Sequence, residues 1–334
     1  MIDILAFRIK TMALFKRLCQ SSGRPFYRYS STCCPSTTTI KPIEASANTL
    51  RHLQFTPILP FEDGLQIQEK FVKAQLDIKD MQSKIRKKLE ALKKEYEGST
   101  INEHEQKILD QIMAMKPNPL LLTFEFQPTY TGGKRIKKSI TEEQIKKYED
   151  FVPTTQKGNP RPKYVQVERG GQITFHGPGQ LVAYVILDLR TFEKFPAKCL
   201  VSSIEKATMN TLKNLEIDET GKQLNLKTKT TENTGVWTED DKKIASIGIH
   251  VRRSITSHGV AINVNTDLSY MKSFEMCGLQ NSSPTSLVDQ TGYNNIDVQQ
   301  VAIQFAKEFA KILGIQKVER IQITEEDVNA MQSN

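Results

Sequence analysis

A lysine and a cysteine, Lys243 and Cys277, carry the side chains of this chain best suited to covalent chemistry. A thiolate is a strong nucleophile, but a free cysteine with a pKa of about 8.5 is only slightly ionised at neutral pH. An ammonium group held beside the sulfur lowers that pKa, and a desolvated lysine amine can act as a general base. Such a pair can take an acyl group from a thioester and pass it to an amine. By its local sequence alone, Cys277 is better explained as a packed apolar side chain.

A second group of polar and flexible residues lies between residues 169 and 184. Arg169, Gly170 and Gly171 let the main chain pass close to a ligand beside one fixed cation. Thr174 and His176 are two positions apart, so they share one face of an extended segment. A Gly-Pro-Gly turn then precedes the apolar run 181–187, which suits a buried strand. We therefore expect a substrate cradle that leads into a sheet.

Several motifs, in this order along the chain, resemble those of the lipoyl(octanoyl) transferases of lipoate biosynthesis. The block 169–184 is similar to their R-G-G-x-x-T-x-H-x-P-G-Q signature, and residues 235–237 to their G-V-W motif. The segment 243–248 is similar to their K-[IV]-A-x-[IL]-G strand, and residues 258–263 to their H-G-x-A-x-N segment. Cys277 then stands where the family has a Cys-Gly turn, although Met276 replaces the usual proline.

This resemblance implies an α/β (α+β) fold in which helices flank a mixed sheet, similar to the catalytic domain of biotin and lipoate protein ligases. It implies transfer of octanoyl from octanoyl-acyl carrier protein to a specific lysine of lipoyl domains. Cys277 would hold the acyl group as a thioester and Lys243 would act as general acid and base, without a metal or other cofactor. The implied acceptors are lipoyl-domain proteins such as the glycine-cleavage H protein or 2-oxoacid dehydrogenase E2 subunits. The implied substrate-binding residues are Arg169, Gly170, Gly171, Gln172, Ile173, Thr174, Phe175, His176, Ser246, Ile247, Gly248, His258, Gly259, Val260 and Ala261.

The residues leave three alternatives to this function: a ligase, a non-catalytic scaffold and a zinc site. An ATP-dependent lipoate or biotin protein ligase of the same fold class would activate its acid as an adenylate and would need no nucleophilic cysteine. A non-catalytic scaffold could bind lipoyl domains or carrier proteins through a helical insertion. A zinc site could use His176, His258 and Cys277, but no pair of them has the spacing of metal ligands.

Apolar periodicity predicts the elements that position these motifs. Residues 65–97 and 101–115 have apolar side chains at three- and four-residue steps, which indicates two amphipathic helices. We interpret residues 80–116 as a charged helical insertion, and residues 129–135 as a turn. Further strands and helices are expected at 120–126, 181–187, 198–212, 243–249, 259–264 and 297–313. Because these alternate without a strict βαβ repeat, the pattern predicts a mixed sheet.

The first 34 residues differ from the rest of the chain in charge. They contain six basic residues and one acid, and no Asp or Glu occurs from residue 4 to residue 43. A basic, Ser-rich and acid-poor segment is typical of an organellar transit peptide, and an untargeted basic tail is the alternative. We expect a mitochondrial presequence over 1–34, a catalytic domain over 48–320 and a C-terminal tail over 321–334. The expected location is the mitochondrial matrix.

Charge and hydropathy exclude two classes of partner. The net charge is +8, but the first 34 residues contribute most of it, so the body lacks the basic excess typical of nucleic-acid binders. No run of about 18 apolar residues occurs, so we expect no membrane-spanning helix. Outside the presequence the chain has two cysteines, Cys199 and Cys277, and we expect no disulfide framework.

Overall fold

The computed structural model describes residues 40–95, 102–155, 158–218, 220–274 and 283–332. All of them belong to one compact unit, Ser31–Asn334. The segment expected as a presequence, 1–34, lies outside the described residues.

An eight-stranded sheet with the order β11-β1-β2-β6-β10-β9-β8-β7 forms the centre of this unit. Strand β1 pairs in parallel with β2 and β11, whereas the other neighbours pair antiparallel, so the expected mixed sheet is confirmed. The strands are β1 (Thr49–Leu59), β2 (Leu120–Phe126), β6 (Gln180–Ile186), β7 (Thr228–Lys229), β8 (Val236–Thr238), β9 (Lys243–Arg252), β10 (Ile255–Asn263) and β11 (Lys317–Ile323).

A smaller sheet of three strands carries the residues that precede the Gly-Pro-Gly turn. Its order is β4-β3-β5, with β3 parallel to β4 and antiparallel to β5. The strands are β3 (Thr129–Gly132), β4 (Lys163–Gln166) and β5 (Ile173–His176). The turn expected at 129–135 is therefore wrong for its first four residues. A strand of four residues bounded by Pro128 and Gly133 is too short to show a periodic pattern.

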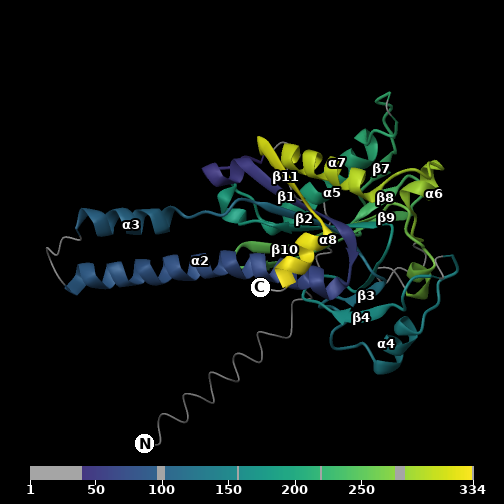
Figure 1. The fold of residues 1–334 in the computed structure, drawn as a ribbon, viewed down its shortest axis with the longest axis horizontal. Helices are drawn as coiled ribbons and strands as arrows, with labels where there is room; N and C mark the ends of the chain where they lie inside the picture. The colour runs from purple at the N-terminus through teal and green to yellow at the C-terminus, as the bar shows by residue number, and fades with distance from the viewer. Residues whose placement is uncertain (1–39, 96–101, 156–157, 219, 275–282, 333–334) are drawn as a thin grey trace, which may run out of the picture. The chain divides into compact units, whose positions relative to one another are not determined.

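Helices cover both faces of the large sheet (Figure 1). On one face α5 (Ala197–Asn214) and α7 (Val298–Ile312) pack against each other and against the sheet, around the larger apolar core. On the other face the first half of α2 (Phe61–Glu95) contacts β2, β6 and β10. The remaining helices and turns are η1 (Ala45–Asn48), α3 (Glu103–Ala114), α4 (Glu142–Glu149), η2 (Leu189–Thr191), η3 (Tyr270–Ser273), α6 (Leu287–Thr291) and α8 (Glu325–Gln332).

The apolar pattern explains the position of α7. Val301, Phe305 and Phe309 recur at four-residue steps and are fully buried on the sheet. The side chain of Asp297 accepts a hydrogen bond from the Gln299 N–H at 3.1 Å and so caps the helix, as the sequence predicts.

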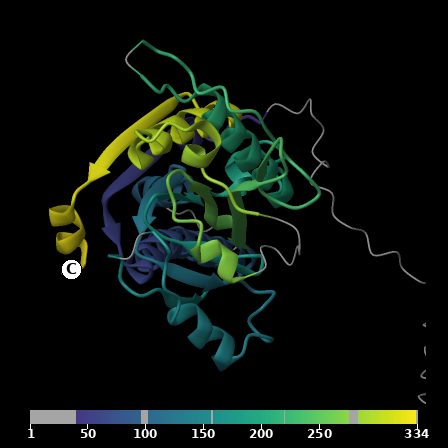
Figure 2. The same cartoon turned by 90° about the vertical axis from the view of Figure 1, so that its right-hand side faces the viewer.

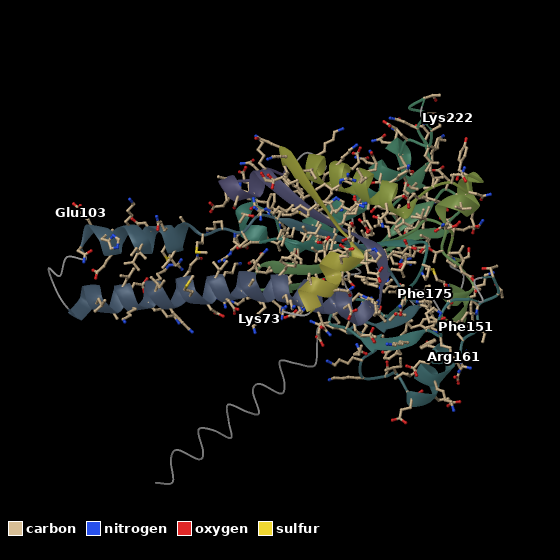
Figure 3. All side chains as sticks on the ribbon, viewed as in Figure 1. Lys73, Glu103, Phe151, Arg161, Phe175 and Lys222 are labelled. Atoms are coloured by element: carbon tan, nitrogen blue, oxygen red, sulfur yellow. The ribbon has the colours of Figure 1, made fainter. Side chains whose placement is uncertain are left out.

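Helix α2 continues beyond the sheet and pairs there with α3 (Figures 1 and 3). A buried ion pair between Lys79 Nζ and the Asp188 carboxylate, at 2.7 Å, holds α2 where it leaves the sheet. Further along, the Gln82 side chain donates hydrogen bonds to the carbonyls of Ile112 at 3.0 Å and Met115 at 2.9 Å. Residues 80–116 therefore form paired helices where they are described. That this arm is an insertion relative to the family stays a prediction.

The catalytic domain extends beyond its expected C-terminal boundary at residue 320. Residue 320 falls inside β11, whose residues 317–323 pair in register with β1, and α8 follows it. Figure 2 shows this edge of the sheet with β11 and α8 in yellow. Much of β11 is exposed as an edge strand, so its sequence lacks the apolar signal of a central strand.

Gly64 provides a test of how α2 packs on the sheet. A Cβ at this position would lie 2.4 Å from the Phe126 ring. Gly64→Ala should therefore lower the free energy of unfolding by about 1–3 kcal/mol despite the better helix propensity of alanine. Urea unfolding measures this, with Gly158→Ala as the control because no atom lies within 4 Å of its added Cβ. Equal stability of the two variants would contradict this packing.

Candidate active site

A cavity opens on the α2 face of the sheet, between the glycine-rich loop, the strands β6, β9 and β10, and the first turn of α2. Lys243 lines it, together with every residue expected to bind substrate except Phe175. The structure therefore brings together residues from three sequence motifs that are up to about 90 positions apart.

Phe175 corrects the sequence interpretation, because its side chain points away from the cavity. Its ring stacks on Tyr270 with centroids 4.3 Å apart and lies 5.3 Å from the Tyr130 ring (Figure 3). Successive side chains of a strand face opposite sides, so Thr174 and His176 line the cavity whereas Phe175 packs behind it. Its role is to support the strand.

Arg169 braces the glycine-rich loop from within. Its Nη1 donates hydrogen bonds to the carbonyls of Gly170 and Gln172, both at 3.0 Å. Its Nη2 donates to the carbonyl and the hydroxyl of Thr131, both at 2.8 Å. The side chain is only 8% exposed. The guanidinium therefore holds the cavity wall in shape, in addition to placing positive charge there.

Two glycines let this loop lie against its neighbours. A Cβ on Gly133 would lie 2.4 Å from the Gly171 carbonyl oxygen, and one on Gly248 would lie 3.0 Å from the Gly170 oxygen. The Gly170 N–H donates to the Ile249 carbonyl at 3.1 Å, which ties the loop to β9. These contacts explain why β9 and the segment after β3 have glycine at these two positions.

His176 is a buried, neutral imidazole. Its Nδ1 is 2.9 Å from Gln180 Oε1, and Gln180 in turn donates to Asn263 Oδ1 at 2.9 Å. Phe61, the first residue of α2, stacks on the His176 ring with centroids 5.3 Å apart. Burial, with a smaller effect of the Arg169 charge, lowers the pKa of His176 to about 3.

His258 lies within β10 but has an unusual backbone conformation. Its φ of 61° is in the left-handed region, and its backbone N–H donates to Gln68 Oε1 of α2 at 2.6 Å. Its ring lies edge-on to Tyr184, 5.5 Å away. Burial, followed by the Arg169 charge, lowers the pKa of His258 to about 3. Both cavity histidines therefore offer hydrogen bonds and no positive charge at neutral pH.

Lys243 lies at the start of β9 and is 2% exposed. Its Nζ donates to the Thr234 carbonyl at 3.0 Å and lies 5.1 Å from the centre of the Trp237 ring. The carbonyl and the aromatic face both stabilise a cation. The G-V-W motif therefore serves the lysine directly.

Cys277 lies outside the described residues, so its position relative to Lys243 is untested. The described residues on either side of it are attached to the cavity. Phe274 lines the cavity, and the Lys243 N–H donates to the Ser283 carbonyl at 2.9 Å. Cys199 packs on the opposite, α5–α7 side of the sheet and is disulfide-bonded.

The sequence did not single out the apolar lining of the cavity, which comprises Phe61, Val167, Val182, Tyr184 and Phe274. Val182 and Tyr184 alternate on β6, so strand periodicity could have assigned both to the cavity face. Phe61 had no comparable signal, because only the packing of α2 brings it there.

The described part of the chain contains no cluster of three or more His, Cys, Asp or Glu side chains arranged to hold a metal ion. None of its helices is long and apolar enough to cross a membrane.

Comparisons with known proteins agree with the fold and with the motifs. Residues 99–310 match the family described as "Lipoyl protein ligase A/B catalytic domain". The chain is 65% identical over 296 residues to "Octanoyltransferase, mitochondrial" of Saccharomyces cerevisiae, covering 88% of this chain and 90% of that protein. It is 57% identical over 299 residues to the protein of the same name from Kluyveromyces lactis, covering 89% and 90%.

Solved structures share the fold at low sequence identity. A putative lipoate protein ligase of T. acidophilum has a TM-score of 0.51 and 13% identity, over 85% of this chain and 93% of that one. LipL1 of P. falciparum, in complex with lipoate, has a TM-score of 0.52 and 16% identity, over 86% and 68%. These values confirm the expected similarity to lipoate protein ligases at the level of fold.

The buried histidines predict how stability depends on pH. Burial lowers the folded-state pKa to about 4 for His52 and about 3 for His176 and His258, whereas unfolded histidine titrates near 6.5. Their contribution is complete above about pH 6.5 and is lost as the pH falls toward those folded values. We expect the free energy of unfolding to drop by about 1 kcal/mol per histidine between about pH 7.5 and 5.5.

Urea unfolding at the two pH values measures this loss, and NMR of the folded protein should find the three imidazoles still neutral at the lower pH. A free energy of unfolding that does not change over this range would contradict the neutral, buried state of these rings.

Proposed function

Because the chain belongs to the octanoyltransferase family and is an acyltransferase, we propose that it transfers octanoyl from octanoyl-acyl carrier protein to a specific lysine of lipoyl domains. Cys277 carries the acyl group as a thioester and Lys243 exchanges protons. The observation that supports this most directly is the attachment of both flanks of the Cys277 segment to the cavity that Lys243 lines.

The short spacing along the chain supports a position of Cys277 near the lysine. Two residues lie between it and Phe274 at the cavity, and three extended residues span at most about 10 Å. On the other side Ser283 is hydrogen-bonded to the main chain of Lys243, and the Thr285 N–H donates to the Lys243 carbonyl at 3.0 Å. The described residues that flank the thiol segment therefore lie at the cavity wall and at the main chain of Lys243.

The proton transfers of the proposed reaction balance through Lys243. The amine takes the Cys277 proton, and the thiolate attacks the donor thioester. The carrier sulfur leaves with the proton from the Lys243 ammonium, and octanoyl stays on Cys277. The acceptor lysine then attacks this thioester as a neutral amine and gives its proton to Lys243, and the Cys277 sulfur leaves and takes that proton, which restores the starting pair. The product is an amide, and the donor thioester supplies the driving force.

The cavity suits an acyl chain on one side and a reacting carbonyl on the other. Phe61, Val182 and Tyr184 provide an apolar wall, and the neutral imidazoles of His176 and His258 add hydrogen-bonding groups without charge. Removing the chain from water there is favourable by about 0.8 kcal/mol for each buried CH2 group.

Octanoyltransferase and lipoate-ligase relatives support lipoyl-domain proteins as the acceptors, such as the glycine-cleavage H protein or E2 subunits. The names of the two yeast relatives support a mitochondrial location. The matrix as compartment and residues 1–34 as presequence belong to the proposal. A reporter fused to residues 1–45 that stays in the cytoplasm would contradict the presequence.

An acyl-enzyme on Cys277 is the central prediction. Incubation with octanoyl-carrier protein should add one octanoyl mass that neutral hydroxylamine removes, and Cys277→Ala should abolish both this adduct and transfer. Intact-protein mass spectrometry under reducing conditions measures the adduct. A purified lipoyl domain as acceptor should be modified without nucleotide.

The same assay distinguishes the ligase alternative. Free octanoate with ATP and magnesium should give no modification of the lipoyl domain. Modification only in that mixture, with Cys277→Ala still active, would mean that the protein is an adenylating ligase.

A further inference from the structure

A single peptide group connects Lys243 to a buried acid on the other side of the sheet. The carbonyl of Thr234 accepts the hydrogen bond from Lys243 Nζ at 3.0 Å. The N–H of Gly235, which belongs to the same peptide unit, donates to Glu205 Oε1 at 3.1 Å. The peptide therefore has the ammonium at its oxygen end and the carboxyl group at its N–H end.

Glu205 is the one charged residue among the buried side chains of α5. It lies on the buried side of α5, between Ile204 and Ala207, and is 1% exposed. An acid that is removed from water costs several kcal/mol unless a donor or an opposite charge faces it. Burial raises the pKa of Glu205, while the Gly235 hydrogen bond and the Lys243 charge lower it. The carboxyl group thus interacts electrostatically with the lysine that lines the cavity.

No side chain larger than that of glycine fits at position 235. Its φ is 130°, and a Cβ there would lie 2.6 Å from Lys243 Cε and 2.6 Å from the Ala245 carbonyl oxygen. The lysine side chain therefore lies directly against the main chain that Glu205 holds. Any rotation of the 234–235 peptide would move the acceptor of the ammonium.

We propose that Glu205 is a positioning residue for Lys243, acting through the Thr234–Gly235 peptide. This inference rests on the proposed function only in taking Lys243 as the group that exchanges protons. By accepting from the N–H, the carboxylate orients and polarises the peptide, which strengthens its carbonyl as an acceptor for the ammonium. Its charge also interacts directly with the Lys243 side chain.

The other ionisable groups that line the cavity do not supply this negative charge. Arg169 is a cation, and burial keeps His176 and His258 neutral. The charge of Glu205, by contrast, acts on Lys243.

The test compares Glu205→Gln, Glu205→Ala and a matched control. Glutamine keeps an oxygen acceptor for the Gly235 N–H and loses the charge, whereas alanine loses both. Glu308→Gln is the control, because Glu308 is a buried acid of α7, 6% exposed, that accepts from Asn214 Nδ2 at 2.9 Å. Lys243→Arg, which keeps a cation but cannot act as a base, sets the scale for loss of function.

Two measurements are made on each variant over a range of pH. The first is octanoyl transfer to a lipoyl domain. The second is the rate at which acetic anhydride acetylates Lys243, read by peptide mass spectrometry, which needs no catalytic activity. Urea unfolding separates loss of stability from loss of positioning.

We expect Glu205→Ala to lose about a hundredfold in transfer and Glu205→Gln about tenfold, so that glutamine partly rescues alanine. In Glu205→Gln the acetylation profile and the pH–rate profile should move to lower pH by about one unit, since loss of the negative charge favours the neutral amine. Glu308→Gln should leave both profiles unchanged.

Wild-type transfer and acetylation profiles in both Glu205 variants would overturn the inference. So would a loss of transfer that follows stability alone while the acetylation profile stays unchanged. If the wild-type protein transfers no octanoyl but the acetylation profile still moves, the proposed function fails and the positioning role of Glu205 stands.

Discussion

The buried amine of Lys243 constrains most of this site. Lys243 is 2% exposed, and a charged group buried without partners costs several kcal/mol. Three groups of the surrounding chain stabilise Lys243: the carbonyl of Thr234, the aromatic face of Trp237 and the acid Glu205. These groups come from β8, the turn before it and a helix on the far side of the sheet, so the burial of one amine links both layers of the fold.

Close main-chain contacts are the second requirement of the site. The loop that begins at Arg169 lies against β9 and the segment after β3 at distances that exclude a Cβ at Gly133 and Gly248. The guanidinium fills the remaining space and donates four hydrogen bonds to carbonyl and hydroxyl oxygens. Rigid walls of this kind place reacting groups without the entropy cost of ordering a mobile loop.

How much of this the sequence predicts depends on the range of the interaction. The lysine strand, the glycine-rich loop and the mixed sheet follow from local motifs and periodicity, and the helices at 198–212 and 297–313 lie as expected within a few residues. Phe175 was misassigned because a motif names adjacent residues without regard to the alternation of a strand. Phe61 and Glu205 could not be found in this way, since their contacts with His176 and Gly235 join elements 115 and 30 positions apart.

The spacing of residues along α2 has a geometric consequence. Phe61, Gln68, Gln75 and Gln82 follow one another at seven-residue steps, and all four are buried. Seven residues make nearly two full turns, so the four side chains form one stripe, with about 10.5 Å between successive members. The first meets His176, the second the His258 N–H and the fourth the carbonyls at the end of α3. Inserting or deleting one residue within this stretch would rotate the later members by about 100° and break their contacts. The contacts of Phe61, Gln68 and Gln82 therefore fix the rotation of α2 about its axis from the cavity wall to the arm. An insertion or deletion before Gln82 would disturb them.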